Sequence, residues 1–401
     1  YAGAMFPWQS GSSGREECQR MHLNPKSGRW NPDASALAHH VGLAVAYNVW
    51  QYYQATADLA FLIDYGAEML IEIARFWVSR TEYDEDRERY VIRGVIGPDE
   101  FHSGYPEAPH EGIDNNAYTN VMAVWAILRA LDALELLPTP NRLDVMEKLG
   151  LDRVELAQWR LVSRRMFVPF HDELISQFEG YEKLAELDWD AYRKRYGDIH
   201  RLDRILDAEG DDVNRYKASK QADVLMLFYL LSSNQLSNVL QRLGYRLRPG
   251  QISRMVDYYI ARTSHGSTLS SVVHSWVLAR ANRDQAMEFF HQVLSSDVDD
   301  VQGGTTSEGI HLAAMAGSVD LVQRCFTGLV FRRDRIVLSP NWPESLGTLG
   351  FPIHYRGMHL HLRVSGRGAE ISVDPRDAPP VEIECRGRVR LLTPGSMLRF
   401  A

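Results

Sequence analysis

Residues 34–55 read ASALAHHVGLAVAYNVWQYYQA, and this stretch shows the pattern that decides the fold. Its apolar side chains recur at steps of three and four residues: Leu37, Val41, Val45, Val49 and Tyr52. That spacing places them on one face of an α-helix. Residues 58–79 repeat the pattern, and we expect further helices near residues 116–137, 152–166, 217–232, 251–262, 268–281, 284–294 and 306–316.

Loops of unequal length separate these helical stretches. Residues 1–33 are rich in Gly, Ser, Pro and Trp and predict a loop, and residues 80–113 interrupt the helical pattern with charges, glycines and prolines. Short turns that alternate with long loops predict a toroid of paired helices. A helical solenoid would give a similar pattern, but the sequence shows no self-similarity at the period of about 34–47 residues typical of such repeats.

The character of the chain changes after about residue 330. The runs that follow are short, partly alternating, and separated by Gly, Pro and Asp: residues 336–338, 359–364, 370–373, 381–385 and 389–392. They predict a small all-β domain. We therefore expect a helical catalytic domain over residues 1–330 and a β domain over residues 331–401.

Composition excludes several classes of protein. The 401 residues are 45% hydrophobic and 24% charged, which allows a sizeable packed core. The formal net charge of −8 argues against a nucleic-acid surface, although one pocket can still be locally positive for an anionic small ligand. No apolar run reaches about 18 residues, so we expect no membrane-spanning helix. The chain starts at Tyr1 rather than at Met, and we expect it to be a piece of a longer protein.

The sequence contains three cysteines: Cys18, Cys325 and Cys385. They lie far apart, are odd in number and lack metal-ligand spacing, which favours a reduced, cytoplasmic protein. His39-His40 fits helix packing better than a metal pair, so we expect neither a metal nor a cofactor.

Residues 97–102 read Gly-Pro-Asp-Glu-Phe-His and place two acids and a histidine on a turn. Glycosyl transfer requires a protonated carboxylic acid beside the leaving oxygen. Asp99 and Glu100 are expected to point in different directions, so that one reaches a pocket while the other orders the turn. Taken alone, an acidic Gly-Pro turn of this kind fits a solvated loop better.

Polar clusters begin two of the expected helices. Asp114–Asn120 read Asp-Asn-Asn-Ala-Tyr-Thr-Asn, with more amide and hydroxyl groups than a helix N-cap needs. Lys220-Gln221 precede an apolar helix. The first cluster suits hydrogen bonds to sugar hydroxyls or to the catalytic loop, although a plain cap explains it better when it is taken alone. Lys220 is explained equally well as a surface lysine.

Two further loops are rich in glycine and hydroxyl groups. Thr263–Ser270 contain His265, Gly266, Ser267 and Thr268 ahead of a helix, and residues 303–309 read Gly-Gly-Thr-Thr-Ser-Glu-Gly. Helix N-termini with hydroxyl donors bind anions well, although Ser/Thr caps are common. Both loops lack the Gly-Lys-Ser/Thr ending of a Walker loop.

These segments, in this order, resemble glycoside hydrolase family 65, the family of the inverting phosphorylases of maltose, trehalose, kojibiose and nigerose. The motifs that carry the resemblance span nearly the whole chain: Phe6–Gln9, Val95–Glu100, Asp114–Asn120, Lys220–Asp223, His265–Ser270 and Gly304–His311. Each motif is weak alone, whereas the ordered set is specific. The resemblance implies a partial (α/α)6 barrel that lacks its first helices, followed by the small β domain, and in some relatives a homodimer.

The resemblance also implies roles for individual residues. Glu100 is the general acid, and the glucosyl unit is bound by Lys220 and Gln221. Apart from the resemblance, we expect Trp8, Asp99 and His102 to lie at the sugar site, with Asp99 better suited to ordering the turn. Inorganic phosphate, the co-substrate, is bound by His265, Ser267 and Thr268, with Gly304 and Thr305 close by. Maltose-type members resemble Cys-His-Asn-Glu where this chain has Cys18-Gln19-Arg20-Met21, so the acceptor sugar is left open.

Two alternatives remain at this point. One is an inverting α-glucoside hydrolase of the same fold, which would need a second carboxylate to activate water. The other is an inactive sugar-binding or scaffold piece.

Overall fold

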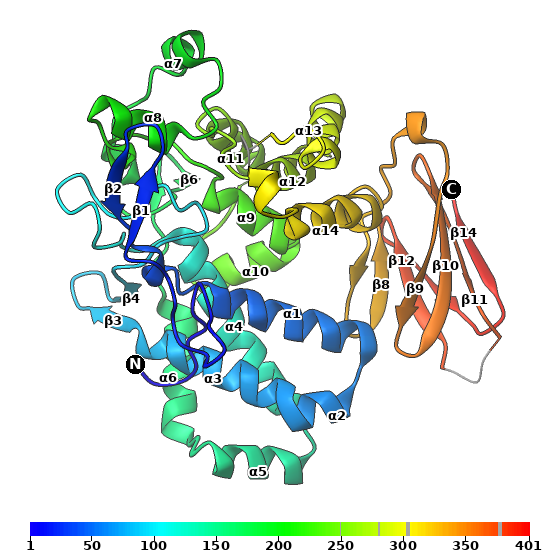
Figure 1. Ribbon diagram of the computed structural model, residues 1–401. Helices are drawn as coiled ribbons and strands as arrows, with labels where there is room; N and C mark the ends of the chain where they lie inside the picture. The colour runs from blue at the N-terminus through cyan, green and yellow to red at the C-terminus, as the bar shows by residue number, and fades with distance from the viewer. Residues whose placement is uncertain (249, 280, 302–304, 376–378) are drawn as a thin grey trace. The chain divides into compact units, whose positions relative to one another are not determined.

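The computed structural model describes residues 1–248, 250–279, 281–301, 305–375 and 379–401 (Figure 1). Its α-helices are α1 Val41–Thr56, α2 Leu59–Phe61, α3 Ala67–Ser79, α4 Ala117–Leu136, α5 Thr139–Lys148, α6 Arg153–Arg165, α7 Trp189–Tyr196, α8 Leu202–Glu209, α9 Asp223–Leu230, α10 Ser233–Arg242, α11 Gln251–Ile260, α12 Thr268–Leu278, α13 Arg283–Ser295 and α14 Leu312–Asp320. Its strands are β1 Met21–Asn24, β2 Arg29–Pro32, β3 Thr81–Asp84, β4 Arg89–Ile92, β5 Phe170–His171, β6 Leu174–Ile175, β7 Val330–Phe331, β8 Arg335–Leu338, β9 Leu349–Tyr355, β10 Met358–Ser365, β11 Gly368–Val373, β12 Val381–Cys385, β13 Arg388–Leu392 and β14 Met397–Phe400.

The chain forms two compact units. Unit 1 contains Tyr1–Tyr47 and Ile63–Val273, and unit 2 contains Asn48–Leu62 and His274–Ala401. The division between domains at residue 330 stays a prediction.

Helix α4 is the centre of unit 1. Every residue from Ala117 to Ile127 is buried. The sequence permits this because it places no charge in these three turns, and a helix that is apolar on all sides belongs in a core. Helices α3, α6, α9 and α10 pack around α4.

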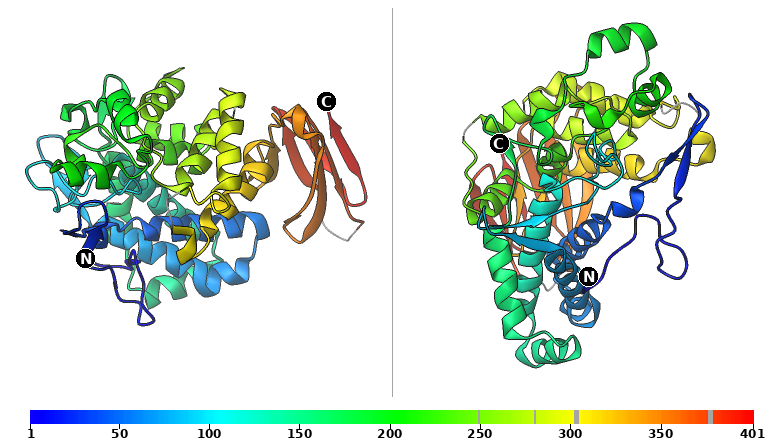
Figure 2. Two further views of the ribbon diagram at one scale, coloured as in Figure 1. Left: turned by 45° about the horizontal axis from the view of Figure 1, so that its top comes forward. Right: turned by 90° about the vertical axis from the view of Figure 1, so that its left-hand side faces the viewer.

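The C-terminal strands of unit 2 form two four-stranded sheets, with the orders β14-β11-β10-β9 and β13-β12-β8-β7 (Figure 2). Alternate residues of β10 are buried, from Met358 to Val364, as expected for strands that cover a core on one face. The prediction of a mainly α-helical chain followed by a small all-β domain is confirmed. The runs expected to be strands correspond to β8, β10, β11, β12 and β13.

Some element boundaries differ from the predictions. The helix expected from residue 217 begins at Asp223, because the preceding backbone pairs with another loop. The helix expected from residue 306 begins at Leu312, because His311 binds the Asp297 carboxylate through its backbone N–H at 3.0 Å. Residues 1–33, predicted as loop, contain the β1–β2 hairpin, which is anchored by the Asn24 side chain to α8.

Candidate active site

The turn at residues 97–102 has a defined and tightly packed conformation. The backbone N–H of Glu100 donates to the Gly97 carbonyl at 3.2 Å, and Glu100 has a φ angle of +64°. This is the left-handed region, which residues with a Cβ rarely adopt. A Cβ at Gly97 would lie 2.0 Å from Asp223 Oδ2, so only glycine fits without a shift. The turn is therefore not a loosely solvated loop.

The two acids of the turn have different surroundings. Asp99 is 2% exposed, and its Oδ1 accepts the backbone N–H groups of Lys220 and Gln221 at 2.6 and 3.2 Å. Its Oδ2 accepts Gln177 Nε2 at 2.8 Å. The side chain of Glu100 is 36% exposed, and its Oε1 lies 3.2 Å from Lys220 Nζ. Of the two acids, only Glu100 is therefore accessible to a substrate.

Gln221 is buried beneath the same turn. Its Nε2 donates to the Pro98 carbonyl at 3.1 Å, whereas its Oε1 has no hydrogen-bond partner among the described residues. An unpaired buried acceptor costs about 1–3 kcal/mol. Such an atom is a natural acceptor for a ligand hydroxyl group.

His102 lies inside the turn at 2% exposure. Its Nδ1 is 3.2 Å from Asp99 Oδ2, and its Nε2 is 3.0 Å from the Tyr216 carbonyl oxygen. Both ring nitrogens therefore face acceptors. The structure places Asp99 and His102 where they brace the turn from within, and their contact with sugar stays a prediction.

The loop at residues 263–270 lies directly beside Lys220. Ser264 donates its backbone N–H to the Ser219 carbonyl at 2.8 Å, which joins the two segments. A Cβ at Gly266 would lie 2.3 Å from the His200 carbonyl oxygen and 3.1 Å from Lys220 Cγ. The fold thus brings together three predicted segments: the Glu100 turn, Lys220-Gln221 and the His265 loop.

Within this loop, His265 also adopts a left-handed conformation, with φ +58°. Its Nδ1 is 2.9 Å from Ser270 Oγ, which fixes the ring. Ser267 immediately precedes α12, and its Oγ accepts the Leu269 N–H at 3.2 Å. Thr268, the first residue of α12, is 7% exposed. The predicted phosphate ligands thus sit at a helix N-terminus, where backbone dipoles attract anions.

Trp8 reaches the turn through His40. The two rings lie 5.4 Å apart between centroids, and His40 Nδ1 is 3.3 Å from the carbonyl oxygen of Ile96, which precedes the turn. Burial lowers the pKa of His40 to about 4, so its ring is neutral at pH 7. Burial likewise lowers the pKa of His39 to about 4, and its ring packs edge-on against Phe76.

The second predicted anion loop belongs to unit 2. Gly304 lies outside the described residues, and Thr305 begins a 3-10 turn, Thr305–Glu308. The role of this loop stays a prediction.

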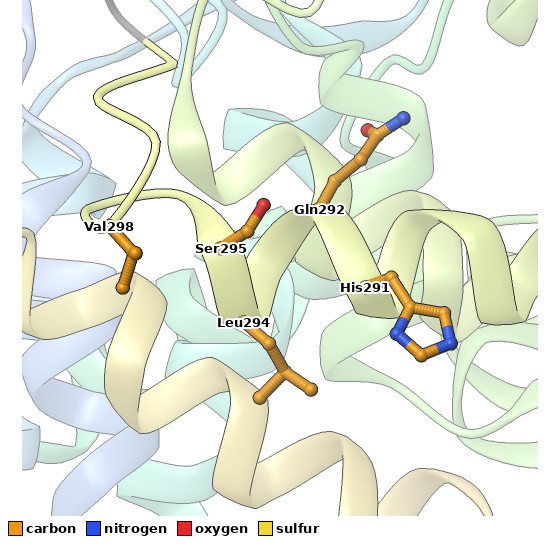
Figure 3. Close-up of a pocket in the computed structure, with 5 residues that line it drawn as sticks. All are labelled: His291, Gln292, Leu294, Ser295 and Val298. Atoms are coloured by element: carbon orange, nitrogen blue, oxygen red, sulfur yellow. The ribbon is translucent and has the colours of Figure 1, made fainter.

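Sequence reasoning missed residues that support the turn from other segments. Asp223 and Asn116 lie within the quoted motifs but received no role of their own, and their spacing alone carries no further signal. Gln177 lies on a segment that shows no motif. A separate surface hollow of about 490 Å³, along α13 in unit 2, is lined by none of the predicted residues (Figure 3). Among the described residues, no group of three or more His, Cys, Asp or Glu side chains could hold a metal ion.

Two protein-family models match the chain. A model described as the glycosyl hydrolase family 65 central catalytic domain matches residues 1–320, and one described as the C-terminal domain of that family matches residues 329–392. The chain therefore belongs to glycoside hydrolase family 65, which confirms the resemblance drawn from its motifs.

Individual relatives are consistent with this membership. The chain is 67% identical over 395 residues to an uncharacterized glycosyl hydrolase of Mycobacterium tuberculosis, covering 98% of this chain and 30% of that protein. It is 37% identical over 366 residues to trehalose 6-phosphate phosphorylase of Lactococcus lactis, covering 90% of this chain and 46% of that protein. The chain thus spans half or less of the length of these curated relatives.

A solved structure shares the fold. A putative kojibiose phosphorylase from the human microbiome superposes with a TM-score of 0.77 at 24% identity, over 100% of this chain and 53% of that one.

Among the described residues, no helix combines the length and the apolar character needed to cross a membrane.

Proposed function

We propose that this chain carries the catalytic centre of an inverting phosphorylase that cleaves an α-linked glucosyl disaccharide into β-D-glucose 1-phosphate and a free sugar. The observation that carries the proposal is the accessible Glu100 carboxylate, whose Oε1 lies 3.2 Å from Lys220 Nζ while the His265 loop lies against the same lysine. An acid, a cation and a helix N-terminus of the kind that suits an anion lie within one unit, which supports the proposal.

The chemistry follows from the charges that develop during glycosidic cleavage. Glu100, in its protonated form, donates its proton to the glycosidic oxygen as the bond to the anomeric carbon breaks. A phosphate oxygen attacks that carbon from the opposite face, which inverts the configuration from α to β. The leaving sugar departs as a neutral alcohol, and Glu100 regains a proton before the next turnover.

Lys220 and Gln221 are assigned to the glucosyl unit. Gln221 Oε1 has no partner among the described residues and would accept a sugar hydroxyl. Protonation of Glu100 removes the attraction that holds Lys220, so the ammonium group becomes available to a second hydroxyl. Trp8 offers an aromatic face near the turn, while Asp99 and His102 hold the turn from inside.

Phosphate is assigned to His265, Ser267 and Thr268 at the start of α12, with Gly304 and Thr305 as a second loop. Hydroxyl groups, backbone N–H groups and an imidazole suit a dianion that is already nucleophilic. No metal ion or organic cofactor is needed for this reaction.

The buried carboxylates disfavour the hydrolase alternative. An inverting hydrolase needs a second carboxylate about 6.5–9.5 Å from the acid to activate water. Asp99 and Asp223 lie near Glu100, but Asp99 is 2% exposed and Asp223 is 1% exposed, and both accept hydrogen bonds from buried N–H groups. Neither is available to a water molecule.

The names of the relatives indicate the class of glucosyl donor but not the glycosidic linkage that is cleaved. Matches to phosphorylases of trehalose 6-phosphate, kojibiose and α,α-trehalose all point to an α-glucosyl donor. The segment Cys18–Met21, which leads into β1, is where we expect acceptor choice to be set.

The deciding experiment is a panel of α-linked disaccharides, including 6-phosphorylated trehalose, assayed with and without inorganic phosphate in the full-length natural protein. We expect phosphate-dependent release of β-glucose 1-phosphate, identified by NMR of the anomeric proton. Glu100→Gln should lower kcat by about 10²–10⁴-fold. Glu107→Gln, an exposed residue on the same long loop, serves as the matched control.

Two results would contradict the proposal. Sugar release without phosphate and without glucose 1-phosphate would assign a hydrolase. Undiminished phosphorolysis by Glu100→Gln would show that another group donates the proton.

A further inference from the structure

Asp223 contacts the backbone of the Glu100 turn, although it lies on a different segment. It is the first residue of α9 and is 1% exposed. Its Oδ1 accepts the backbone N–H of Asp99 at 2.6 Å, and its Oδ2 accepts Asn116 Nδ2 at 2.6 Å. The backbone immediately before the acid is thus held by a carboxylate from the segment that carries Lys220.

The contact is reciprocal. Asp99 Oδ1 accepts the backbone N–H groups of Lys220 and Gln221, so a carboxylate of the turn holds the lysine segment in return. Gln177 braces the pair, because its Nε2 donates to Asp99 Oδ2 at 2.8 Å and its Oε1 accepts the Asp223 N–H at 3.1 Å. We call the pair of Asp99 and Asp223 the carboxylate clasp.

The clasp leaves little freedom of movement. A Cβ at Gly97 would lie 2.0 Å from Asp223 Oδ2 and 2.6 Å from Asn116 Nδ2. The Asp99 N–H and Asn116 Nδ2 also donate hydrogen bonds to the two oxygens of the same Asp223 carboxyl group, each at 2.6 Å. Small displacements of Glu100 relative to Lys220 are therefore resisted by both packing and hydrogen bonding.

Such an arrangement is costly for stability. Burial raises the pKa of Asp223 well above its usual value, and the neighbouring charge of Asp99 raises it further. Buried charges are weak contributors to stability because of their desolvation cost, so neutral side chains would hold a purely structural turn at a lower cost. The cost indicates that the geometry of the turn matters for function.

We propose that Asp223 is a positioning residue of the phosphorolysis proposed above: through the carboxylate clasp it fixes the Glu100 carboxyl group relative to Lys220. It touches neither substrate in this role, being buried behind the turn. A misplacement of about 1 Å can lower a rate by about 10²-fold, so its loss acts on kcat rather than on substrate affinity.

The test exchanges donor and acceptor between Asp223 and Asn116. Asp223→Asn replaces two acceptor oxygens by one, so it loses the bond either to Asp99 N–H or to Asn116 Nδ2. The double variant Asp223→Asn/Asn116→Asp restores a donor opposite an acceptor. Asn116→Asp keeps an acceptor for the Thr119 N–H, which Asn116 Oδ1 accepts at 2.9 Å, but it removes the Nδ2 donor from the Gln177 carbonyl at 3.3 Å. Asp152→Asn, at the N-cap of α6, is the matched control for a carboxylate-to-amide change at a helix start.

In the full-length natural protein we expect Asp223→Asn to lower kcat by about 10–100-fold, with KM for the disaccharide and for phosphate changed less than about two-fold. The double variant should regain part of that loss, and Asp152→Asn should match the wild type. Hydrogen exchange of the 97–102 backbone, measured by mass spectrometry, should accelerate in Asp223→Asn and slow again in the double variant.

The outcomes separate the two proposals. If the wild type fails to perform phosphorolysis, the proposed function is wrong and the positioning role fails with it. If the wild type is active and folded Asp223→Asn keeps its kcat, only the positioning role is wrong. A folded Asp223→Asn variant whose 97–102 backbone exchanges at the wild-type rate also overturns the clasp as the cause.

Discussion

The Glu100 turn and the His265 loop both contain a residue in the left-handed region, but different kinds of contact surround them. Each places a non-glycine residue in the left-handed region, with φ of +64° and +58° respectively, and each contains a glycine at which a Cβ would collide. At Gly97 the colliding atoms belong to side chains, Asp223 and Asn116. At Gly266 the nearest colliding atom is a backbone carbonyl oxygen, that of His200.

The difference matches the role that we propose for each segment. The turn is held by buried carboxylates, which fix one side chain, Glu100, in one orientation. The His265 loop is joined to its neighbour by backbone hydrogen bonds at Ser219 and precedes a helix N-terminus, which suits the phosphate site that we propose there. A proton donor requires orientation, whereas an anion site requires several donors around one charge.

Among the tests of this comparison, the largest expected change in kinetics and stability comes from adding one methyl group at Gly97 or at Gly266. Gly97→Ala should push Asp223 away and lower kcat by about 10–100-fold, with smaller changes in KM. Gly266→Ala should instead move backbone, raise KM for phosphate by several-fold and lower the free energy of unfolding by about 1–3 kcal/mol. Steady-state kinetics with phosphate varied, together with urea denaturation, measure both. Identical kinetic defects in the two variants would remove the distinction drawn here.

A smaller effect is expected from relieving the two left-handed residues. The left-handed conformation costs about 1–2 kcal/mol for a residue with a Cβ, a cost that glycine avoids. We therefore expect Glu100→Gly to be more stable than Glu100→Ala, and His265→Gly to be more stable than His265→Ala, by about 1 kcal/mol each. Comparing Gly with Ala cancels the loss of the side chain itself. Equal unfolding midpoints in urea would mean that the left-handed conformation is not retained in solution.

The smallest expected effect is the pH dependence of the contribution that Asp223 makes to the stability of the folded state. Burial, followed by the charge of Asp99, raises the pKa of Asp223 in the folded state above the value of about 3.9 expected when unfolded. Between those two values the folded state binds more protons, so the contribution of Asp223 to stability is present at low pH and is lost as pH rises.

Urea denaturation of the wild type and of Asp223→Asn across the acidic range measures this contribution. The stability difference between them, wild type minus variant, should fall as pH rises above about 3.9. Asp152→Asn, whose carboxylate lies at the N-cap of α6, should not reproduce this trend. A difference that grows with pH would reverse the sign and contradict the assigned cause.

Local patterns predicted most of the elements. The 3.6-residue spacing of residues 34–55 and the helical pattern of residues 116–137 both correspond to helices, because helix formation depends on neighbours within one or two turns. The start of α9 was misplaced because Lys220 and Gln221 use their backbone N–H groups to bind Asp99, a residue more than a hundred positions away. The spacing of neighbouring residues contains no information about a partner so distant in the sequence.

In the candidate site, too, some residues were predicted from the sequence and one was missed. The Gly-Pro-Asp-Glu turn, the lysine–glutamine pair and the His265 loop were found from residue types, and membership of glycoside hydrolase family 65 followed from their order. Gln177 was missed because a lone glutamine carries no pattern, yet it contacts both carboxylates of the clasp.

By itself, the sequence determined the mainly helical class, the β domain that follows the helices and the residue types on which the proposed acid-assisted transfer to phosphate rests, because composition and periodicity are local properties. Only the tertiary structure decided which of the two adjacent acids is accessible. Asp99 is enclosed by N–H groups from residues 177, 220 and 221, while Glu100 faces outward beside Lys220. Burial depends on contacts between distant segments, and those contacts exist only in the folded chain.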